Sequence, residues 1–223
     1  MEIDSAITAR HSCRAFLTSP VSQEPITEIV TLAQRSPSWC NSQAWQLDIP
    51  TGTATSHLSD ALIAAASDGT AAAPDVPWPA RYVDAYAERR RTCGFALYDS
   101  VGIARDDHDA RFAQALENLR FFGAPHVAIV TSPKDLGAYG LIDCGSFIST
   151  FQYVAQSRGV STIAQAAPTM YSETIRGELG ISPDRDILCA LAFGFEDTEH
   201  PINRFRTERA DASSVIAWHE SPR

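Results

Sequence analysis

The spacing of apolar residues along the chain predicts a series of amphipathic helices. In the clearest one, four apolar residues fall at i, i+3, i+4 and i+7: Ile26, Ile29, Val30 and Ala33. Ser22 precedes them as a candidate N-cap. Comparable patterns predict an opening helix through Arg10 with Asp4 or Ser5 as its cap, and helices around Leu58, Leu62 and Ala65 and over residues 82–91, 107–122, 143–158 and 169–179. Glycines at 123, 159 and 180 are typical terminators of the last three.

Three other stretches predict strands. Residues 45–49 alternate between apolar and polar, and residues 126–130 are interpreted as a buried strand. Residues 187–193 are apolar throughout, which is typical of a strand covered on both faces. The helices between these strands differ in length, and this favours an α+β fold with helices packed around a mostly antiparallel or mixed sheet. No Gly-x-Gly-x-x-Gly turn follows a strand, which argues against a Rossmann domain. Residues 67–79, rich in proline, glycine and alanine, predict an exposed loop of the kind that often covers a site.

Length and charge narrow the class of protein. The 223 residues fit a single domain over 1–223, and the formal net charge of −9 argues against a nucleic-acid partner. No apolar run reaches the roughly 20 residues that a spanning helix needs, and acidic residues stand where a signal peptide carries positive charge. We therefore expect a cytoplasmic protein that does not enter a membrane.

The cysteines and histidines show no metal-binding spacing. Five cysteines are scattered without a Cys-x-x-Cys pair, which favours reduced thiols over a disulfide framework or a zinc site. The six histidines show no ligand spacing either. Cys40 is interpreted as a small packed residue in preference to a reactive thiol.

Arginine-rich segments stand near both ends of this acidic chain: residues 10–14 (Arg-His-Ser-Cys-Arg) and 203–209 (Asn-Arg-Phe-Arg-Thr-Glu-Arg). Guanidinium groups match phosphate oxygens in a bidentate way, so the two ends would form one anion site if the fold joins them. Residues 37–45 carry amides and hydroxyls beside two indoles, which suits the edge of a pyrimidine-like ring. Together these features indicate a site for a mononucleotide-type cofactor. A third basic run, residues 89–91, is either another anion site or a solvated helix terminus, and we favour the terminus slightly.

These boxes resemble those of the bacterial nitroreductase family. The family's Arg-(Arg/His)-Ser-x-(Arg/Lys) box is matched by Arg10, His11, Ser12 and Arg14. Its Pro-Ser-x-x-Asn-(Ser/Thr)-Gln-Pro-Trp box is matched from Pro37 to Trp45, except that Ala44 replaces the second proline. The likeness continues through residues 119–125 and 143–147 to Arg209. The resemblance implies a nitroreductase-like fold that binds flavin mononucleotide (FMN) and forms a domain-entwined homodimer.

The resemblance also assigns roles to residues. It places Arg10, Ser12 and Arg209 at the FMN phosphate, with His11 in the same box and with Arg206 or Arg204 as alternatives to Arg209. It places Arg14 near N1 and the C2 carbonyl of the flavin, where a permanent cation stabilises the reduced ring.

The second box and a later segment complete the implied site. Pro37, Ser38, Trp39 and Asn41 would contact a flavin bound mainly by the other subunit, while Gln43 orients the loop and Trp45 joins the core. Ala166 and Ala167 would run under the flavin, with a backbone N–H directed at N5, although relatives often carry glutamate at the position of Ala166. Asn118 or Arg120 would meet the pyrimidine edge, or else lie at the surface.

The implied activity is reduction of nitroaromatic compounds by NADH or NADPH. Hydride would pass in ping-pong order through the flavin, giving nitroso and then hydroxylamine products, and no catalytic side chain is expected because the flavin does the chemistry. The Pro-Ser-Trp-Cys-Asn variant resembles a subgroup acting on nitrobenzoates and simple nitroaromatics. The alternatives are an FMN-dependent dehydrogenase or oxidase, a quinone or enone reductase, and a flavin-binding protein without catalysis.

Overall fold

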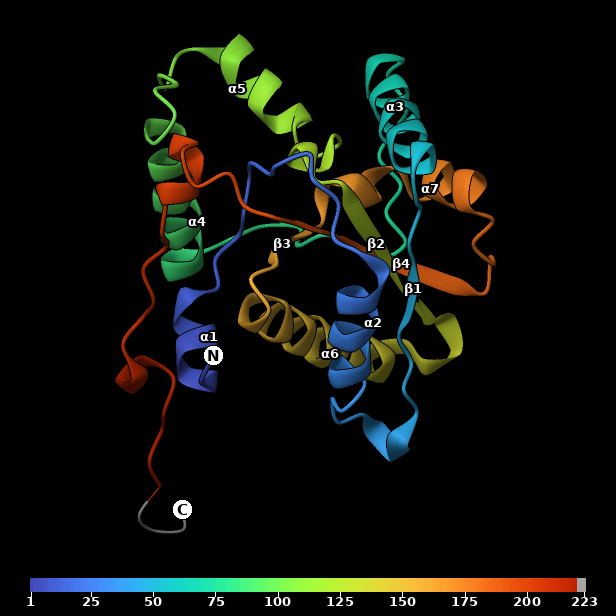
Figure 1. Cartoon of the computed structure of the whole chain (residues 1–223). Helices are drawn as coiled ribbons and strands as arrows, with labels where there is room; N and C mark the ends of the chain where they lie inside the picture. Colours follow the sequence, from blue (N-terminus) through green and yellow to red (C-terminus); the bar gives the residue numbers. More distant parts are fainter. Residues whose placement is uncertain (220–223) are drawn as a thin grey trace.

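The computed structural model describes residues 1–219 and contains one four-stranded sheet (Figure 1). The strands are β1 (Gln46–Asp48), β2 (His126–Pro133), β3 (Ser161–Gln165) and β4 (Arg185–Gly194). Their order is β1-β2-β4-β3, and every neighbouring pair is antiparallel. The predicted α+β class and antiparallel sheet are confirmed. The sequence did not predict β3, whose buried residues include the polar Ser161, Thr162 and Gln165.

The helices of the described chain are α1 (Ile3–Ala9), α2 (Gln23–Ala33), α3 (Thr53–Ser67), α4 (Asp84–Asp99), α5 (His108–Leu116), α6 (Gly137–Ser157) and α7 (Ser172–Leu179). Every predicted helix is present, but some ends differ. Glu2, not Asp4 or Ser5, is the N-cap residue of α1. Ser22 does occupy the N-cap of α2, although its side chain makes no capping hydrogen bond there.

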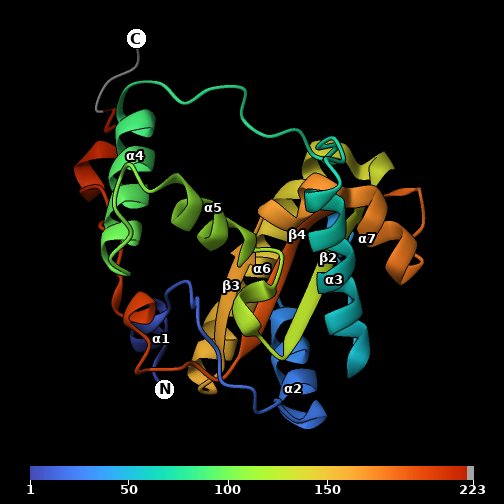
Figure 2. The same ribbon diagram turned by 90° about the horizontal axis from the view of Figure 1, so that it is seen from above.

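Helices cover both faces of the sheet (Figure 2). On one face, α2 and α6 pack through Ile29, Phe147 and Phe151 onto apolar side chains of β2 and β4. On the other, α3 and α7 pack through residues such as Leu58 and Ile175. The central strands are therefore buried on both sides, as the uninterrupted apolar run of β4 predicted.

The predicted helix over 107–122 is wrong at its C-terminal end. α5 ends at Leu116, and the chain then forms the short 3₁₀ helix η2 (Phe121–Gly123). Phe121 and Phe122 are both buried and both have φ of 54°, in the left-handed region. Burial of the two rings in the core thus outweighs the helical preference of the local sequence.

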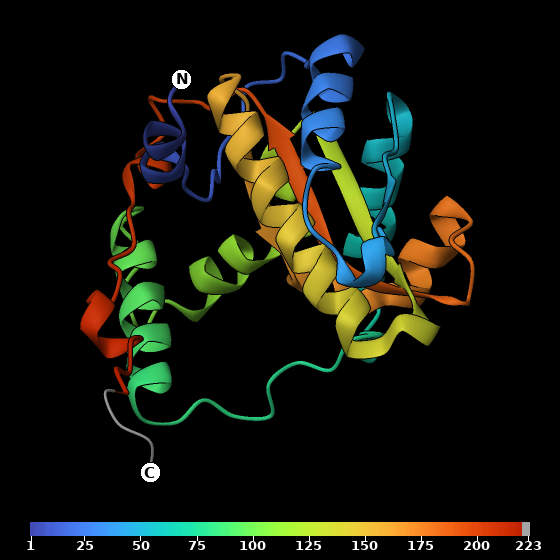
Figure 3. The same ribbon diagram turned by 90° about the horizontal axis from the view of Figure 1, so that it is seen from below.

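Two further boundaries were misplaced. α6 begins at Gly137, six residues before the predicted start at 143, and α4 runs on to Asp99. The arginines at 89–91 therefore lie within a helix, and the preferred interpretation as a helix terminus is wrong. Neither α4 nor α5 contributes a buried residue; α4 stands away from the sheet, whereas α5 runs toward the sheet and packs Leu116 against the core (Figures 2 and 3). Within residues 1–219, no helix is long and apolar enough to span a membrane.

Candidate functional site

The N-terminal arginine box is held against the sheet by its backbone. Ser12 forms a parallel bridge with Thr162 of β3, and the Cys13 N–H donates to the Thr162 carbonyl at 3.1 Å. Farther along, the Leu17 N–H donates to the carbonyl of Phe195 at 2.8 Å, just past the end of β4. Residues 12–17 thus extend the sheet, and this fixes the direction in which the box faces.

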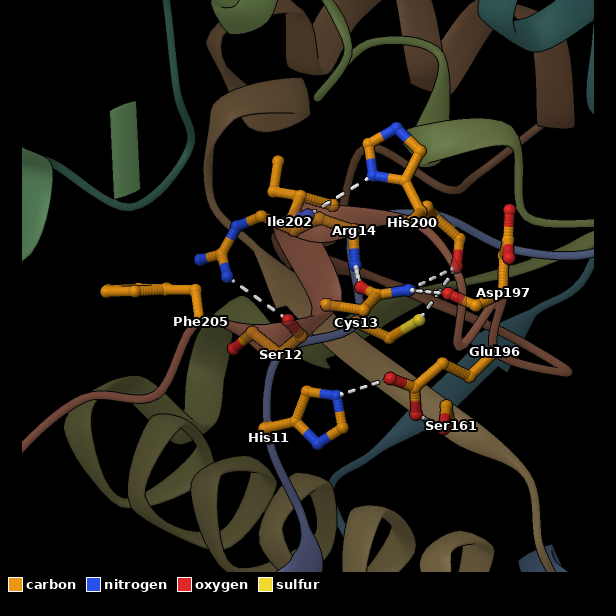
Figure 4. A network of polar contacts seen from close by, with 12 residues as sticks. His11, Ser12, Cys13, Arg14, Ser161, Glu196, Asp197, His200, Ile202 and Phe205 are labelled. Atoms are coloured by element: carbon orange, nitrogen blue, oxygen red, sulfur yellow. Dashed lines mark hydrogen bonds and ion pairs between the residues drawn. The ribbon is translucent and has the colours of Figure 1, made fainter. Parts of the chain in front are cut away.

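Polar contacts join this box to the chain that follows β4 (Figure 4), and a buried asparagine, Asn203, makes several of them. Asn203 is 2% exposed, and its Oδ1 accepts a hydrogen bond from the Arg14 N–H at 2.8 Å. Its Nδ2 donates to the carbonyls of Ala15 and Asp197 at 2.8 and 2.9 Å. The backbone carbonyl of Asn203 also accepts from the Arg206 guanidinium. Asn203 therefore links the two arginine segments, through its side chain to residues 14 and 15 and through its backbone carbonyl to Arg206.

A second polar link ties His11 to the chain after β4. His11 Nε2 lies 3.0 Å from Glu196 Oε1, and Ser161 Oγ donates to Glu196 Oε2 at 3.2 Å. His11 and Glu196 are both largely buried, so this carboxylate is used locally and does not reach the arginines. The sequence prediction for His11 concerned the cofactor box alone, and it did not identify this pairing.

The two arginine segments meet in a cavity of about 460 Å³. Four cations line it: Arg10, Arg14, Arg206 and Arg209. Ser12 adds a hydroxyl group, and no lining residue is acidic. The prediction that the fold joins the two ends is confirmed, whereas Arg204 does not line the cavity.

Burial makes this cluster of cations costly when the cavity holds no anion. Burial lowers the pKa of the Arg10 guanidinium; nearby Tyr153 opposes that shift and Arg209 adds to it. Burial likewise lowers the pKa of Arg14. Arginine keeps its charge at physiological pH regardless, so an anion bound here would relieve like-charge repulsion between partly desolvated cations. The donor set suits phosphate.

Ala166 and Ala167 line a different cavity, of about 590 Å³, together with residues 78–82 and with Arg90 of α4. Asn118 lies close by, because Gln165 Nε2 donates to the Asn118 carbonyl at 3.0 Å. Arg120 is exposed and pairs with Glu117 at 2.8 Å. Of the two residues predicted at a pyrimidine edge, Asn118 therefore lies beside the end of β3, and Arg120 has the surface role.

The Pro37–Trp45 box forms an exposed turn around η1 (Trp39–Asn41). Cys40, Asn41 and Gln43 have φ of 50°, 57° and 49°, a left-handed conformation that non-glycine residues seldom adopt. Such backbone persists only where its surroundings enforce it, and it is frequent at ligand clamps. Cys40 is exposed, so its interpretation as a packed residue is wrong. Trp45 is buried as predicted.

Asp143 on α6 holds this turn in place. The carboxylate is 4% exposed; it accepts from the Trp39 N–H at 3.0 Å and from Ser42 Oγ at 2.7 Å. Within the turn, the Gln43 N–H donates to Ser38 Oγ at 3.1 Å. A charged residue on an otherwise apolar helix stripe was the available signal for Asp143. Asn203 and Glu196 carried no comparable signal.

A single chain does not bring the second box to the arginine cavity. Arg10 lies near Tyr153, toward the C-terminal end of α6, whereas the Trp39 ring packs on Tyr139 at the other end with centroids 5.1 Å apart. The 14 residue steps from Tyr139 to Tyr153 span about 21 Å at 1.5 Å per residue. Figures 1 and 3 show the same separation between α1 and the turn before β1.

The described residues show no metal centre and no disulfide. Across 1–219, no group of three or more histidine, cysteine or acidic residues is placed to hold a metal ion. All five cysteines are free. Burial raises the pKa of Cys13 and of Cys189 to about 12 and that of Cys144 to about 11, so these three thiols are protonated at neutral pH.

The fold and the cavity define an α+β protein with a cationic pocket suited to a phosphorylated ligand. Residues 7–195 match the model of the nitroreductase family, and the chain belongs to this family. Among characterised relatives, nitroreductase NfnB of Mycolicibacterium smegmatis is 33% identical over 95% of this chain and 90% of its own length. A 4-nitrobenzoate reductase of Pseudomonas putida is 31% identical over 93% of this chain and 91% of its own length.

Solved structures show the same fold. The FMN and NADPH-dependent nitroreductase NfnB from Sphigopyxis sp. strain HMH matches with a TM-score of 0.96 and 33% identity, covering 99% of this chain and 100% of its own. NfnB from Mycobacterium smegmatis, solved in complex with NADPH, matches with a TM-score of 0.93 and 31% identity over 97% of both chains. The predicted family and fold are therefore confirmed.

Proposed function

We propose that this protein is an FMN-dependent oxidoreductase that reduces nitroaromatic compounds with NADH or NADPH. The observation that carries the proposal is the acid-free cavity in which Arg10, Arg14, Arg206 and Arg209 converge. It supplies the phosphate site that FMN requires. Relatives described as FMN and NADPH-dependent nitroreductases match nearly the whole chain.

The residues present fit FMN along its length. Arg10, Arg209 and Ser12 would hold the phosphate, and Arg14 would lie near N1 and the C2 carbonyl of the ring. Ala166, Ala167 and Asn118 would meet the ring itself, since they cluster at the end of β3. When bound, FMN supplies two-electron hydride chemistry at its ring system.

The protein's own contribution is position and charge. Asn203 fixes the backbone of Arg14 at 2.8 Å, which keeps a permanent cation at a set place in the site. A rigid cation lowers the cost of negative charge in its neighbourhood without reorganising. The Ala166 backbone N–H would donate a hydrogen bond in the flavin N5 region and so help to orient the ring. No side chain of this chain is assigned as a catalytic acid or base.

The phosphate assignment is tested by Arg10→Ala and Arg209→Ala. Each removes a charge-assisted hydrogen bond of about 1.5–3 kcal/mol, so each raises the Kd for FMN about ten- to hundredfold. Arg204→Ala is the matched control, because Arg204 is an exposed arginine of the same segment outside the cavity. Wild-type Kd values for Arg10→Ala and Arg209→Ala would contradict the assignment.

The reaction is tested by anaerobic absorbance titration with NADH and with NADPH, followed by a nitroarene. Reduction by either nicotinamide and reoxidation by the nitroarene support the proposal, and steady turnover excludes a protein that only carries flavin. Reduction by an organic substrate but by neither nicotinamide indicates the dehydrogenase or oxidase alternative. Faster reoxidation by quinones or enones than by any nitroarene indicates a quinone or enone reductase.

We also propose that the protein is a cytoplasmic homodimer with two shared sites. Free cysteines are typical of a reducing compartment. Trp39 of η1, which packs on Tyr139 of α6, and Ile142 of α6 are 63% and 66% exposed, an apolar surface suited to a second copy. The second box lies too far from its own arginine cavity to serve it, so a partner's box would complete each site.

Shared sites are tested by mixing subunits that carry Arg10→Ala with subunits that carry Asn41→Ala. In a mixed dimer both lesions fall in one site, and the other site is intact. FMN binding and activity therefore return on mixing. If each chain binds its own flavin, mixing restores nothing, and the shared-site proposal is rejected.

A further inference from the structure

The three arginines at 89–91 point to different surroundings, although they are adjacent in sequence. Arg91 forms an ion pair with Glu88 one turn back on α4. Arg89 lies over the ring of Tyr86, 5.9 Å from its centroid, and lines a cavity that also contains Glu88 and Glu208. Both of these arginines thus have acidic neighbours.

Arg90 alone of the three faces the cavity that contains Ala166 and Ala167. Its guanidinium lies 5.4 Å from the centroid of the Tyr82 ring, a cation–π distance that holds the side chain over the cavity wall. Arg81, from the end of the loop before α4, lines the same cavity. The loop and the basic run, which the sequence left without a role, therefore meet at one place.

The walls of this cavity combine aromatic surface with uncompensated positive charge. Trp78 and Tyr82 supply flat apolar faces, while Arg81 and Arg90 supply two cations. No acidic residue lines the cavity, in a chain whose net charge is −9. A planar aromatic molecule with an anionic group satisfies both features at once, because its ring stacks and its anion pairs with guanidinium.

We propose that Arg90, assisted by Arg81, is a specificity-determining anion site for the aromatic substrates of this enzyme. The inference rests on the proposed function, since it places substrate in the cavity beside Ala166. Its ligand is a ring that carries a carboxylate or a phosphorylated group. Two sources share this chemistry: an anionic nitroarene such as a nitrobenzoate, and the phosphate that NADPH carries and NADH lacks.

The experiment compares matched substrates in Arg90→Gln and Arg91→Gln, two variants that remove one charge each from neighbouring positions of α4. 4-Nitrobenzoate and 4-nitrobenzamide share ring and nitro group but differ in charge, and NADPH and NADH differ by one phosphate. Calorimetric titration of 4-nitrobenzoate into the oxidised holoenzyme without a reductant gives its Kd independently of turnover.

Loss of one charge-assisted contact in an open cavity lowers kcat/KM for the anionic member of a pair about tenfold, mainly through KM. If Arg90→Gln lowers the 4-nitrobenzoate to 4-nitrobenzamide ratio and weakens 4-nitrobenzoate binding, the anion is the acceptor's carboxylate. If it lowers the NADPH to NADH ratio instead, the anion is the donor's phosphate. Arg91→Gln leaves both ratios as in wild type.

Two results overturn the inference. One is unchanged ratios in Arg90→Gln. The other is equal changes in Arg90→Gln and Arg91→Gln, which indicate a general electrostatic effect of the positive charges on α4 rather than a specific contact. Failure of the proposed function is distinct from both. In that case the wild-type protein turns over neither nitroarene with either nicotinamide.

Discussion

Asn203→Ala tests whether one buried side chain aligns the two halves of the phosphate site. The substitution removes three hydrogen bonds of 2.8, 2.8 and 2.9 Å and leaves the Arg14 N–H and two carbonyls without those partners. At about 1 kcal/mol net per bond, and more where a buried group stays unsatisfied, the free energy of unfolding falls by roughly 2–4 kcal/mol. Arg14 loses the side chain that fixes its backbone, and residue 203, whose backbone carbonyl accepts from Arg206, loses its ties to Ala15 and Asp197, so phosphate binding weakens beyond the loss of stability.

The assay separates these two effects by titrating FMN and riboflavin, which differ only in the phosphate. A positioning role lowers the FMN to riboflavin affinity ratio about tenfold, because the contacts to the charged group lose alignment. Thr55→Ala is the control, since the buried Thr55 hydroxyl donates to the Pro50 carbonyl at 3.1 Å, at the start of α3. It lowers stability and leaves the ratio unchanged. An unchanged ratio in Asn203→Ala refutes the positioning role, whatever happens to stability.

Asn203→Asp sharpens the same test. The carboxylate keeps an acceptor for the Arg14 N–H but places a second oxygen where Nδ2 donates to the carbonyls of Ala15 and Asp197. Acceptor then faces acceptor in a buried site, so urea denaturation shows this variant to be less stable than Asn203→Ala. Equal stability contradicts the hydrogen-bond assignment.

Three further predictions concern the frame around the site. Asp143→Ala frees the turn that it holds and costs about 2 kcal/mol of stability; the Trp39 amide then exchanges hydrogen faster, and unchanged exchange contradicts the anchoring role. Burial lowers the pKa of His126 below its ordinary 6.5, so the unfolded chain takes up this proton first. Stability is therefore full above about pH 6.5 and declines below it, and His126→Gln removes that part of the pH slope in urea midpoints; an identical slope in the variant contradicts it. Gly140→Ala puts a methyl group against the buried Ser132 hydroxyl and lowers stability by about 1–3 kcal/mol, which a wild-type Tm would disprove.

Local patterns predicted the elements whose surroundings agree with their own preference. The apolar stripe through Ile29 has the helical period and marks the buried face of α2. The continuous apolar run of β4 likewise indicates a strand that is buried on both faces. The failures occurred where tertiary contacts outweigh local preference. Phe121 and Phe122 adopt a non-helical backbone that places their rings in the core. In β3 the polar residues are buried, and Gln165, for example, donates a hydrogen bond to the Asn118 carbonyl.

The same distinction between local pattern and tertiary contact applies to the residues of the site. In a chain of net charge −9, the clusters of arginine at residues 10–14 and 206–209 stand out, and they predicted the cavity that they line. Asn203 and Glu196 act through partners distant in sequence, 189 and 185 positions away. A pattern read along the chain does not contain such pairings.

The joining of the two chain ends also sets the order in which the protein can mature. Arg10 is synthesised about 200 residues before Arg206 and Arg209, roughly 10–40 s at 5–20 residues per second. The strand that positions the C-terminal segment, β4, is central in the sheet and follows the other three strands along the chain. A nascent chain can therefore form its earlier helices before the proposed phosphate pocket is complete. On the proposed phosphate assignment, cofactor loading waits for residues 206–209, and shorter nascent chains do not compete for the cellular pool of flavin.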